Sequence, residues 1–139
     1  MTTTTLTLEV STERELDVVN LTDRVQKAIE ECDLSDGLVT VFVPGSTAAV
    51  TTTEFEPGVF EDLPAALERI APKDAYYKHH ETWGDDNGRS HVRASIIGPD
   101  ITVPFRDSKL LHGTWQQIVL VELDTRPRKR TLYLQIVGD

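Results

Sequence analysis

All four histidines of this sequence lie in one segment, between positions 79 and 112. Imidazole donates protons, accepts protons and binds metal ions near neutral pH, so a group of histidines indicates a functional site. Any one of them alone would be explained as a surface loop residue. The hypothesis of a site therefore depends on the group, which consists of His79, His80, His91 and His112.

The histidines flank a segment of turn-forming residues, Gly84–Gly88. We expect Tyr77–His80 to be extended and His91–Ile97 to be a strand, because the apolar residues of the second stretch suit a strand better than a helix. Successive side chains of an extended chain point to opposite faces, so only one of the two adjacent histidines can serve a given site. The loop then brings His79 together with His91.

Two histidines are too few for zinc, which normally takes three or four protein ligands. Carboxylates are candidates to complete the set, namely Asp85, Asp86 and Glu54. By strand alternation Arg93 shares the face of His91, where a guanidinium is suited to pair with an anion. The pattern predicts a divalent metal, zinc or magnesium, at His79 and His91, with an anion-binding arginine beside it.

The turn Pro44–Ala49 follows a predicted buried strand, Leu38–Val43. It supplies the hydroxyls of Ser46 and Thr47 together with open backbone amides around Gly45, and such a turn can cradle a phosphate. No lysine follows, so it is not a P-loop. A bulge or a strand-to-strand corner explains the same residues equally well.

A second polar run spans residues 112–117. Gln116 is placed for a polar contact with a substrate, and Trp115 forms either a pocket wall or part of the core. Gly113 allows a close backbone approach before the following strand.

The elements that position these residues predict an α+β fold with a largely antiparallel or mixed sheet and two main helices, because strands and two helices precede a run of short-linked strands. The helices are expected from Thr22, as N-cap, to Cys32 and over Val59–Ile70, with Pro64 inside the second pattern. Ile118–Val121 is apolar on both faces, which indicates a central strand or one covered by a partner subunit. The length predicts one domain over residues 1–139.

A net charge of −9 argues against broad binding to nucleic acid or to an anionic membrane, since both need a basic face. The one basic run, 126–130, is expected at a solvated hairpin tip. The single cysteine, Cys32, fits a reducing compartment, and the chain shows neither a signal peptide nor a membrane span. We expect a cytoplasmic protein.

At these residues the sequence resembles the YjbQ-like family, described as secondary thiamine-phosphate synthases, over nearly the whole chain. The motifs that carry the resemblance are Ser46–Glu54, Tyr77-x-His79, Asn87-x-x-x-His91 and Gly113–Gln116. The resemblance implies a homotrimer of small α+β subunits, with pockets near the subunit boundaries and a metal-binding histidine cluster. It also implies a reaction that joins a pyrimidine pyrophosphate to a thiazole phosphate and releases pyrophosphate.

On this resemblance His79 and His91 are metal ligands and catalytic residues, Glu54 has a polar or acid/base role, and Ser46, Thr47 and Asn87 contact the phosphorylated substrate. Arg93 and the metal would neutralise the departing pyrophosphate. Two positions depart from the family pattern. Gly45 stands where many members carry histidine, and His112 stands where an aliphatic residue is common. A metal-assisted hydrolase and a non-catalytic trimer that binds a small anionic metabolite remain alternatives.

Overall fold

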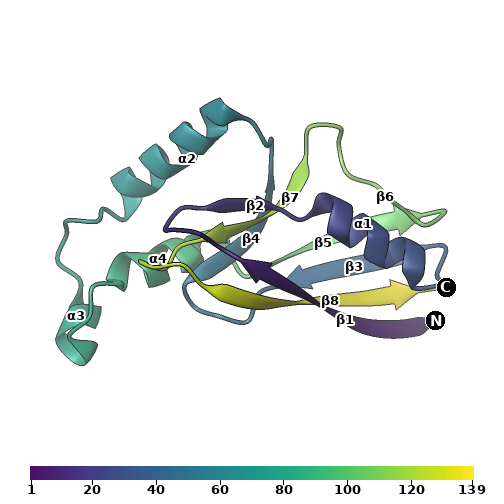
Figure 1. Cartoon of the computed structure of the whole chain (residues 1–139), viewed down its shortest axis with the longest axis horizontal. Helices are drawn as coiled ribbons and strands as arrows, with labels where there is room; N and C mark the ends of the chain where they lie inside the picture. The colour runs from purple at the N-terminus through teal and green to yellow at the C-terminus, as the bar shows by residue number, and fades with distance from the viewer.

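The computed structural model describes residues 1–139, which form eight strands and four helices (Figure 1). The strands are β1 (Thr2–Ser11), β2 (Val18–Asn20), β3 (Gly37–Phe42), β4 (Ala48–Thr53), β5 (Asp100–Arg106), β6 (Lys109–Leu110), β7 (Gln117–Glu122) and β8 (Lys129–Gly138). The helices are α1 (Thr22–Glu31), α2 (Pro57–Ile70), α3 (Lys78–Trp83) and α4 (Gly88–Ile97). The fold is α+β, which confirms the predicted class.

The strands form two sheets in which every pairing is antiparallel. One sheet has five strands in the order β1-β8-β3-β5-β6, and the other has three in the order β2-β7-β4. The two chain ends lie together at one end of the molecule, where Thr2 pairs with Gly138, and α3 and α4 lie at the opposite end (Figure 1).

Strand β7 lies between β2 and β4, and both of its faces are buried. Ile118 and Leu120 belong to the larger hydrophobic core, which β3, β8 and α1 also line. Val119 and Val121 belong to a smaller core with Leu67 of α2. The chain itself therefore covers both apolar faces of this strand. The central-strand interpretation is sufficient, and no partner subunit is needed to explain the pattern.

The predicted strand at His91–Ile97 is wrong, because these residues belong to helix α4. Its apolar residues misled the prediction: Val92 and Ile96 are 39 % and 53 % exposed, whereas the charged Arg93 between them is 2 % exposed. The buried positions Arg89, Ser90, Arg93 and Ala94 follow a helical period. The extended stretch predicted at Tyr77–His80 is also wrong from Lys78 onward, where α3 begins.

Two predictions at helix starts also need correction. Thr22 is the first helical residue and not the N-cap, and its hydroxyl accepts the backbone N–H of Ile118 at 2.9 Å. This bond ties α1 to β7. Helix α2 begins at Pro57, and its N-cap Glu56 accepts the N–H groups of Gly58 and Val59. Pro64 lies inside this helix without breaking it.

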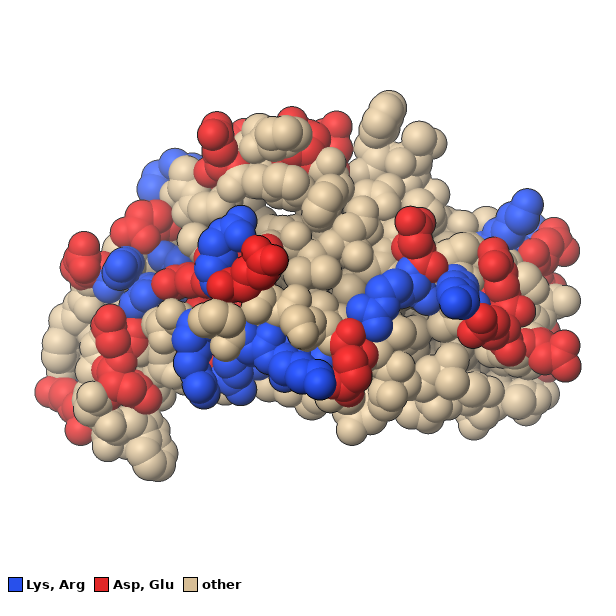
Figure 2. All heavy atoms as spheres, in the orientation of Figure 1, with Lys and Arg blue, Asp and Glu red and all other residues tan.

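Charged side chains of both signs lie on the face shown in Figure 2, where a small basic group sits near the end of β1 and the start of β8. Arg126 and Lys129 are exposed there, as expected for a hairpin tip, but Arg130 is only 5 % exposed. The solvated-tip prediction is therefore wrong for Arg130. None of the four helices has the length and apolarity needed to cross a membrane.

Candidate functional site

Helices α3 and α4 meet at a turn that depends on two glycines. Gly84 ends α3 in the left-handed conformation, with φ of 68°, and its N–H donates to the carbonyl of His80. Gly88 opens α4 so close to Tyr77 that a Cβ at position 88 would lie 2.6 Å from the Tyr77 Cβ. The close approach of the two helices is possible because residue 88 has no side chain.

The turn brings His79 and His91 together, with ring centroids 4.5 Å apart and planes inclined by 44°. His79 Nδ1 lies 3.2 Å from Asp85 Oδ1 but has no well-aligned hydrogen-bond partner, although it is enclosed. His80 faces elsewhere: its Nε2 accepts the backbone N–H of Gly88 at 3.1 Å. His80 therefore holds the start of α4, and the histidine pair of the site is His79 with His91.

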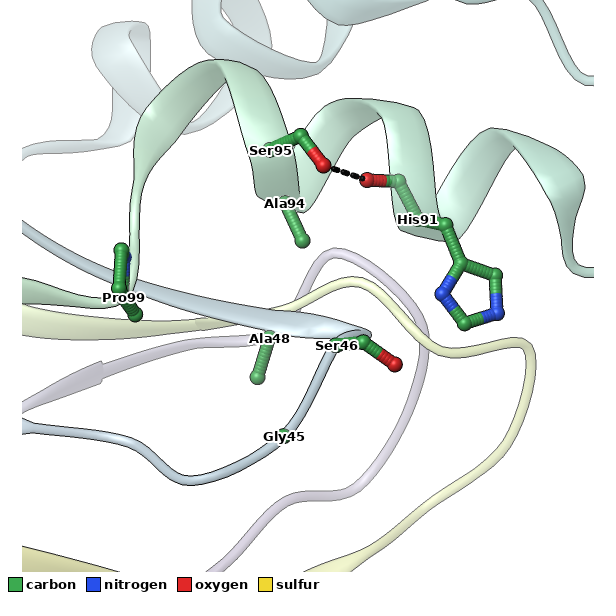
Figure 3. A pocket seen from close by; sticks show the side chains of 7 residues that line it. All are labelled: Gly45, Ser46, Ala48, His91, Ala94, Ser95 and Pro99. Atoms are coloured by element: carbon green, nitrogen blue, oxygen red, sulfur yellow. Dashed lines mark hydrogen bonds between the residues drawn. The ribbon is translucent and has the colours of Figure 1, made fainter.

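His91 also lines a cavity of about 210 Å³ between the turn that precedes β4 and helix α4. Figure 3 shows its ring on α4, across the cavity from the turn that carries Ser46 and Gly45. The hydroxyl of Ser95 donates to the His91 carbonyl at 2.8 Å. The remaining lining residues are Ala48, Ala94 and Pro99. The cavity combines one imidazole, one free hydroxyl and an open turn, a set that suits a small anionic ligand.

Arg93 does not reach this cavity, which corrects its predicted role. On a helix, residues two apart lie on nearly opposite faces, so Arg93 points away from His91. It is 2 % exposed, donates to the carbonyl of Ala71 at 2.9 Å and pairs with Glu68. Arg93 thus fixes α4 to the end of α2, and it is not among the residues that line the cavity.

Arg89 anchors α4 in the same way. It is 2 % exposed, and its Nε and Nη2 donate to the two carboxylate oxygens of Glu15 at 2.7 and 2.8 Å. This hydrogen bonding raises the pKa of Arg89 above its ordinary value. Tyr77 adds a further tie, because its hydroxyl donates to the Pro72 carbonyl at 2.6 Å. Burial raises the pKa of the Tyr77 phenol. These contacts make α4 a rigid support for His91.

Thr47 lies next to the cavity but faces a buried charge network. It is 6 % exposed, and its Oγ1 accepts from Arg130 Nη2 at 2.9 Å and donates to Asp124 Oδ2 at 3.3 Å. Arg130 is also paired with Glu122, which is fully buried. The hydroxyl of Thr47 is therefore occupied within the chain, whereas that of Ser46 is exposed to the cavity.

Gly45 does not border open space on the side where a side chain would lie. A Cβ there would lie 2.9 Å from Nη1 of Arg130. Asn87 lies just before α4, and its Oδ1 is enclosed without a hydrogen-bond partner. The hydroxyl of Ser90, in the first turn of α4, is also enclosed and unpaired. These unpaired atoms lie in the same segment as the histidine pair.

The remaining predicted residues lie at a second hollow, of about 320 Å³. Glu54 and Trp115 line it, and Trp115 is 73 % exposed, so the core alternative for this tryptophan is wrong. Gln116 lies beside it and donates to Thr52 at 3.1 Å. His112 closes the adjacent turn by donating to the carbonyls of Gly113 and Gln116 at 2.9 and 2.8 Å.

The two hollows lie at opposite ends of β4, which starts at Ala48 and runs to Thr53. Six residue steps along an extended strand span roughly 20 Å. Within one chain, Glu54 is therefore too far from His91 to share a proton with it. The sequence motifs predicted one site, but in this chain their residues lie at two separate hollows.

A divalent metal needs more ligands than one chain collects here. No group of three or more histidine, cysteine, aspartate or glutamate side chains is arranged to hold an ion. His79 and His91 supply two nitrogen ligands at most, and zinc requires at least three from the protein. The donor set of one chain does not fit a resident zinc site, so we derive no chemical step through a metal.

Sequence reasoning missed Arg130 and its partner Glu122, although a signal was present. Arg130 alternates with Leu132, Leu134 and Ile136 on one face of β8, and this period-two pattern places it on the core face. Glu122 likewise follows Ile118 and Leu120 at even spacing on β7. A charged pair at the ends of two core faces indicates a buried ion pair.

The fold and cavity define a small α+β protein with a histidine pair beside a glycine–serine turn. The chain belongs to the YjbQ-like family: the model of the UPF0047 YjbQ-like proteins matches residues 6–139. A UPF0047 protein of Mycobacterium tuberculosis strain H37Rv is 40 % identical over 131 residues, which cover 94 % of this chain and 95 % of that protein. One from Archaeoglobus fulgidus is 34 % identical over 128 residues, covering 92 % and 97 %.

Two solved structures share the fold over nearly their full length. One is a YbjQ-like protein of unknown function from Sulfolobus solfataricus P2, with a TM-score of 0.93, 33 % identity and coverage of 99 % of both chains. The other is a hypothetical protein from Aeropyrum pernix K1, with a TM-score of 0.90, 34 % identity and coverage of 98 % and 99 %.

Proposed function

We propose that the cavity between the Gly45–Ser46 turn and α4 binds a phosphorylated small molecule, and that the protein is a transferase of the thiamine-phosphate synthase type. The observation that carries the proposal is the pairing of His79 with His91, whose ring centroids are 4.5 Å apart. Hydrogen bonds of the buried Arg89 and Arg93 hold the helix that carries His91 to the rest of the chain. His91 lines the cavity opposite Ser46, and the cavity is large enough for a phosphate-bearing group.

The reaction joins a thiazole nitrogen to a pyrimidine methylene carbon while the bond from that carbon to pyrophosphate oxygen breaks. Pyrophosphate leaves with the bonding electron pair, so donors that stabilise developing negative charge accelerate the step. His91 is placed to donate to a pyrophosphate oxygen, and Ser46 and the amides of its turn add neutral donors. His79 packs against His91 and orients its ring.

The predicted homotrimer supplies a reason for the second hollow. Glu54 and Trp115 lie too far from His91 to act with it in one chain, but an adjoining subunit can bring one hollow against the other. The exposed apolar residues of α4, Val92 and Ile96, support a subunit contact beside the cavity, because exposed apolar side chains of this size favour burial. We therefore place the complete site at the boundary between two subunits.

The test combines activity with subunit mixing. The purified protein, incubated with the pyrimidine pyrophosphate and the thiazole phosphate, should form thiamine phosphate, and His91→Ala and Glu54→Gln should each lose at least about a hundredfold in rate, as expected for removing a catalytic acid or base. Mixing the two inactive variants under conditions that exchange subunits should restore activity, because some boundaries then contain both native residues.

Three outcomes would count against parts of this proposal. A wild-type protein that binds pyrophosphate without making thiamine phosphate supports the non-catalytic binder, which the absence of a carboxylate from the cavity lining also favours. A monodisperse monomer in light scattering at micromolar concentration contradicts the subunit boundary. Activity that stays lost after mixing, with subunit exchange verified, contradicts the shared site.

A further inference from the structure

We infer that Arg130 is the anion-binding arginine of the cavity and that glycine at position 45 leaves its Nη1 free to contact a phosphate or pyrophosphate group. The inference rests on the proposed function and adds to it the cation that Arg93 was expected to supply. Arg130 lies on β8, which contributes none of the residues that line the cavity, and its guanidinium approaches the lining at Gly45.

The contacts of Arg130 are divided unevenly over its guanidinium. Nε donates to Glu122 Oε1 at 3.0 Å, and Nη2 donates to Glu122 Oε2 and to Oγ1 of Thr47. Nη2 also reaches the Thr47 carbonyl at 3.2 Å. A guanidinium has five N–H donors, and the two on Nη1 form no hydrogen bond within the chain.

A purely structural role explains Nε and Nη2 but leaves Nη1 unexplained. The pair with Glu122 holds β7 to β8, and the bonds to Thr47 fix the start of β4. Polar groups of a residue that is 95 % buried are normally hydrogen-bonded, because a lost hydration shell must be replaced. Nη1 is not one of the enclosed atoms that lack a partner, so its two donors retain access to solvent and are available to a ligand.

Position 45 determines what Nη1 can reach. Gly45 lines the cavity, and a Cβ on it would lie 2.9 Å from Nη1, so Nη1 lies on the side of Gly45 that a side chain would occupy. Figure 3 shows Gly45 on the turn that faces α4, next to Ser46. With glycine here, no side chain separates Nη1 from an anion seated on the turn. Any larger residue would cover the donor or displace the guanidinium.

The charge balance around Arg130 fits an anion site without a strong net field. Glu122 neutralises Arg130, and Asp124 is paired with Arg128. An anion is therefore bound by an oriented donor and not by excess positive charge, which matches the acidic chain as a whole. Charge-assisted hydrogen bonds of this kind are short and strong. The ligand class is a phosphate or pyrophosphate monoester.

The test uses the full-length protein and inorganic pyrophosphate in calorimetric titrations. Arg130→Lys keeps a positive charge beside Glu122 but cannot present Nη1, and Gly45→Ala leaves Arg130 in place but puts a methyl group against Nη1. Each should weaken pyrophosphate binding at least tenfold. Arg128→Lys is the matched control, since Arg128 pairs with Asp124 on the same hairpin, and it should change the affinity less than threefold.

Two further measurements keep the result interpretable. Thermal unfolding shows whether Arg130→Lys is folded, and Gly45→Ala carries the test if it is not. In the wild type, pyrophosphate should shift the NMR signals of the Arg130 Nη1 protons more than those of the Nε proton, which a structural role would not predict. Folded variants that bind pyrophosphate within twofold of wild type, with unshifted Nη1 signals, overturn the inference and leave the proposed reaction standing. If the variants bind pyrophosphate more weakly as expected, but the wild type forms no thiamine phosphate, the proposed reaction alone is overturned. A wild type that binds no pyrophosphate overturns the anion site itself.

Discussion

Gly88→Ala tests whether the contact between α3 and α4 determines the histidine geometry. The new Cβ would lie 2.6 and 2.7 Å from Cβ and Cγ of Tyr77. Carbon atoms pack at about 3.5–4.0 Å, so the two helices must separate by about 1 Å. His79 is two residues beyond Tyr77, and His91 three beyond residue 88, so the pair of rings must move apart with them.

The expected loss of stability follows from two opposing terms. Overpacking of this kind costs about 1–3 kcal/mol. Alanine in place of glycine in a helix gains about 0.8–1.0 kcal/mol at an interior position and less at the first residue, where Gly88 stands. The clash involves atoms at the root of the Tyr77 side chain, which cannot rotate away. We therefore expect a net loss of about 1–2 kcal/mol in the free energy of unfolding.

Urea denaturation measures the stability, and NOE contacts between the ring protons of His79 and His91 report their separation. Gly113→Ala is the matched control, because a Cβ there would meet Gln116 at an ordinary 3.5 Å. It should leave both readouts unchanged. A Gly88→Ala protein that is as stable as wild type and keeps the ring contacts would refute the argument that the absence of a side chain at 88 sets the position of His79.

Three further predictions concern the buried charges and the metal. Glu122→Gln removes the carboxylate that neutralises a buried arginine, and we expect a loss of about 3–5 kcal/mol in urea denaturation; an unchanged midpoint would contradict a buried ion pair. Although burial alone raises the pKa of Asp124, hydrogen bonds from Thr125 and Arg128 lower it below its ordinary value. This stabilisation is therefore present above the unfolded-state pKa, near 3.9, and is lost as pH falls through the folded pKa, so the stability difference between wild type and Asp124→Asn should shrink below about pH 4. A difference that stays constant down to pH 2 would contradict the assignment. Zinc titration should show weak binding that His91→Ala abolishes, because one chain offers two histidine ligands; tight stoichiometric binding that survives this change would mean that the ligands lie elsewhere.

The sequence alone determined the class of the fold and the segment that holds the histidine pair. Alternating and helical hydrophobic periods located β3 and α1 to within one residue at each end, and α2 to within two. The turn residues between His80 and His91 correctly indicated that the chain reverses there, because Gly84 adopts a positive φ that other residues resist and Gly88 has no side chain to clash with Tyr77. Local chemistry was sufficient for these features.

Tertiary structure alone decided what each polar residue contacts. The period of α4 was hidden because Arg89 and Arg93 are buried by carboxylates from distant segments, Glu15 and Glu68, while apolar Val92 and Ile96 face outward. No local pattern encodes such pairings, since they are satisfied by residues more than twenty positions away. For the same reason, the sequence could not show that Arg93 is bonded to Ala71 and Glu68, that Glu54 lies in another hollow, or that Arg130 lies against Gly45. These facts depend on which strands and helices pack together, and that packing is set by the whole chain.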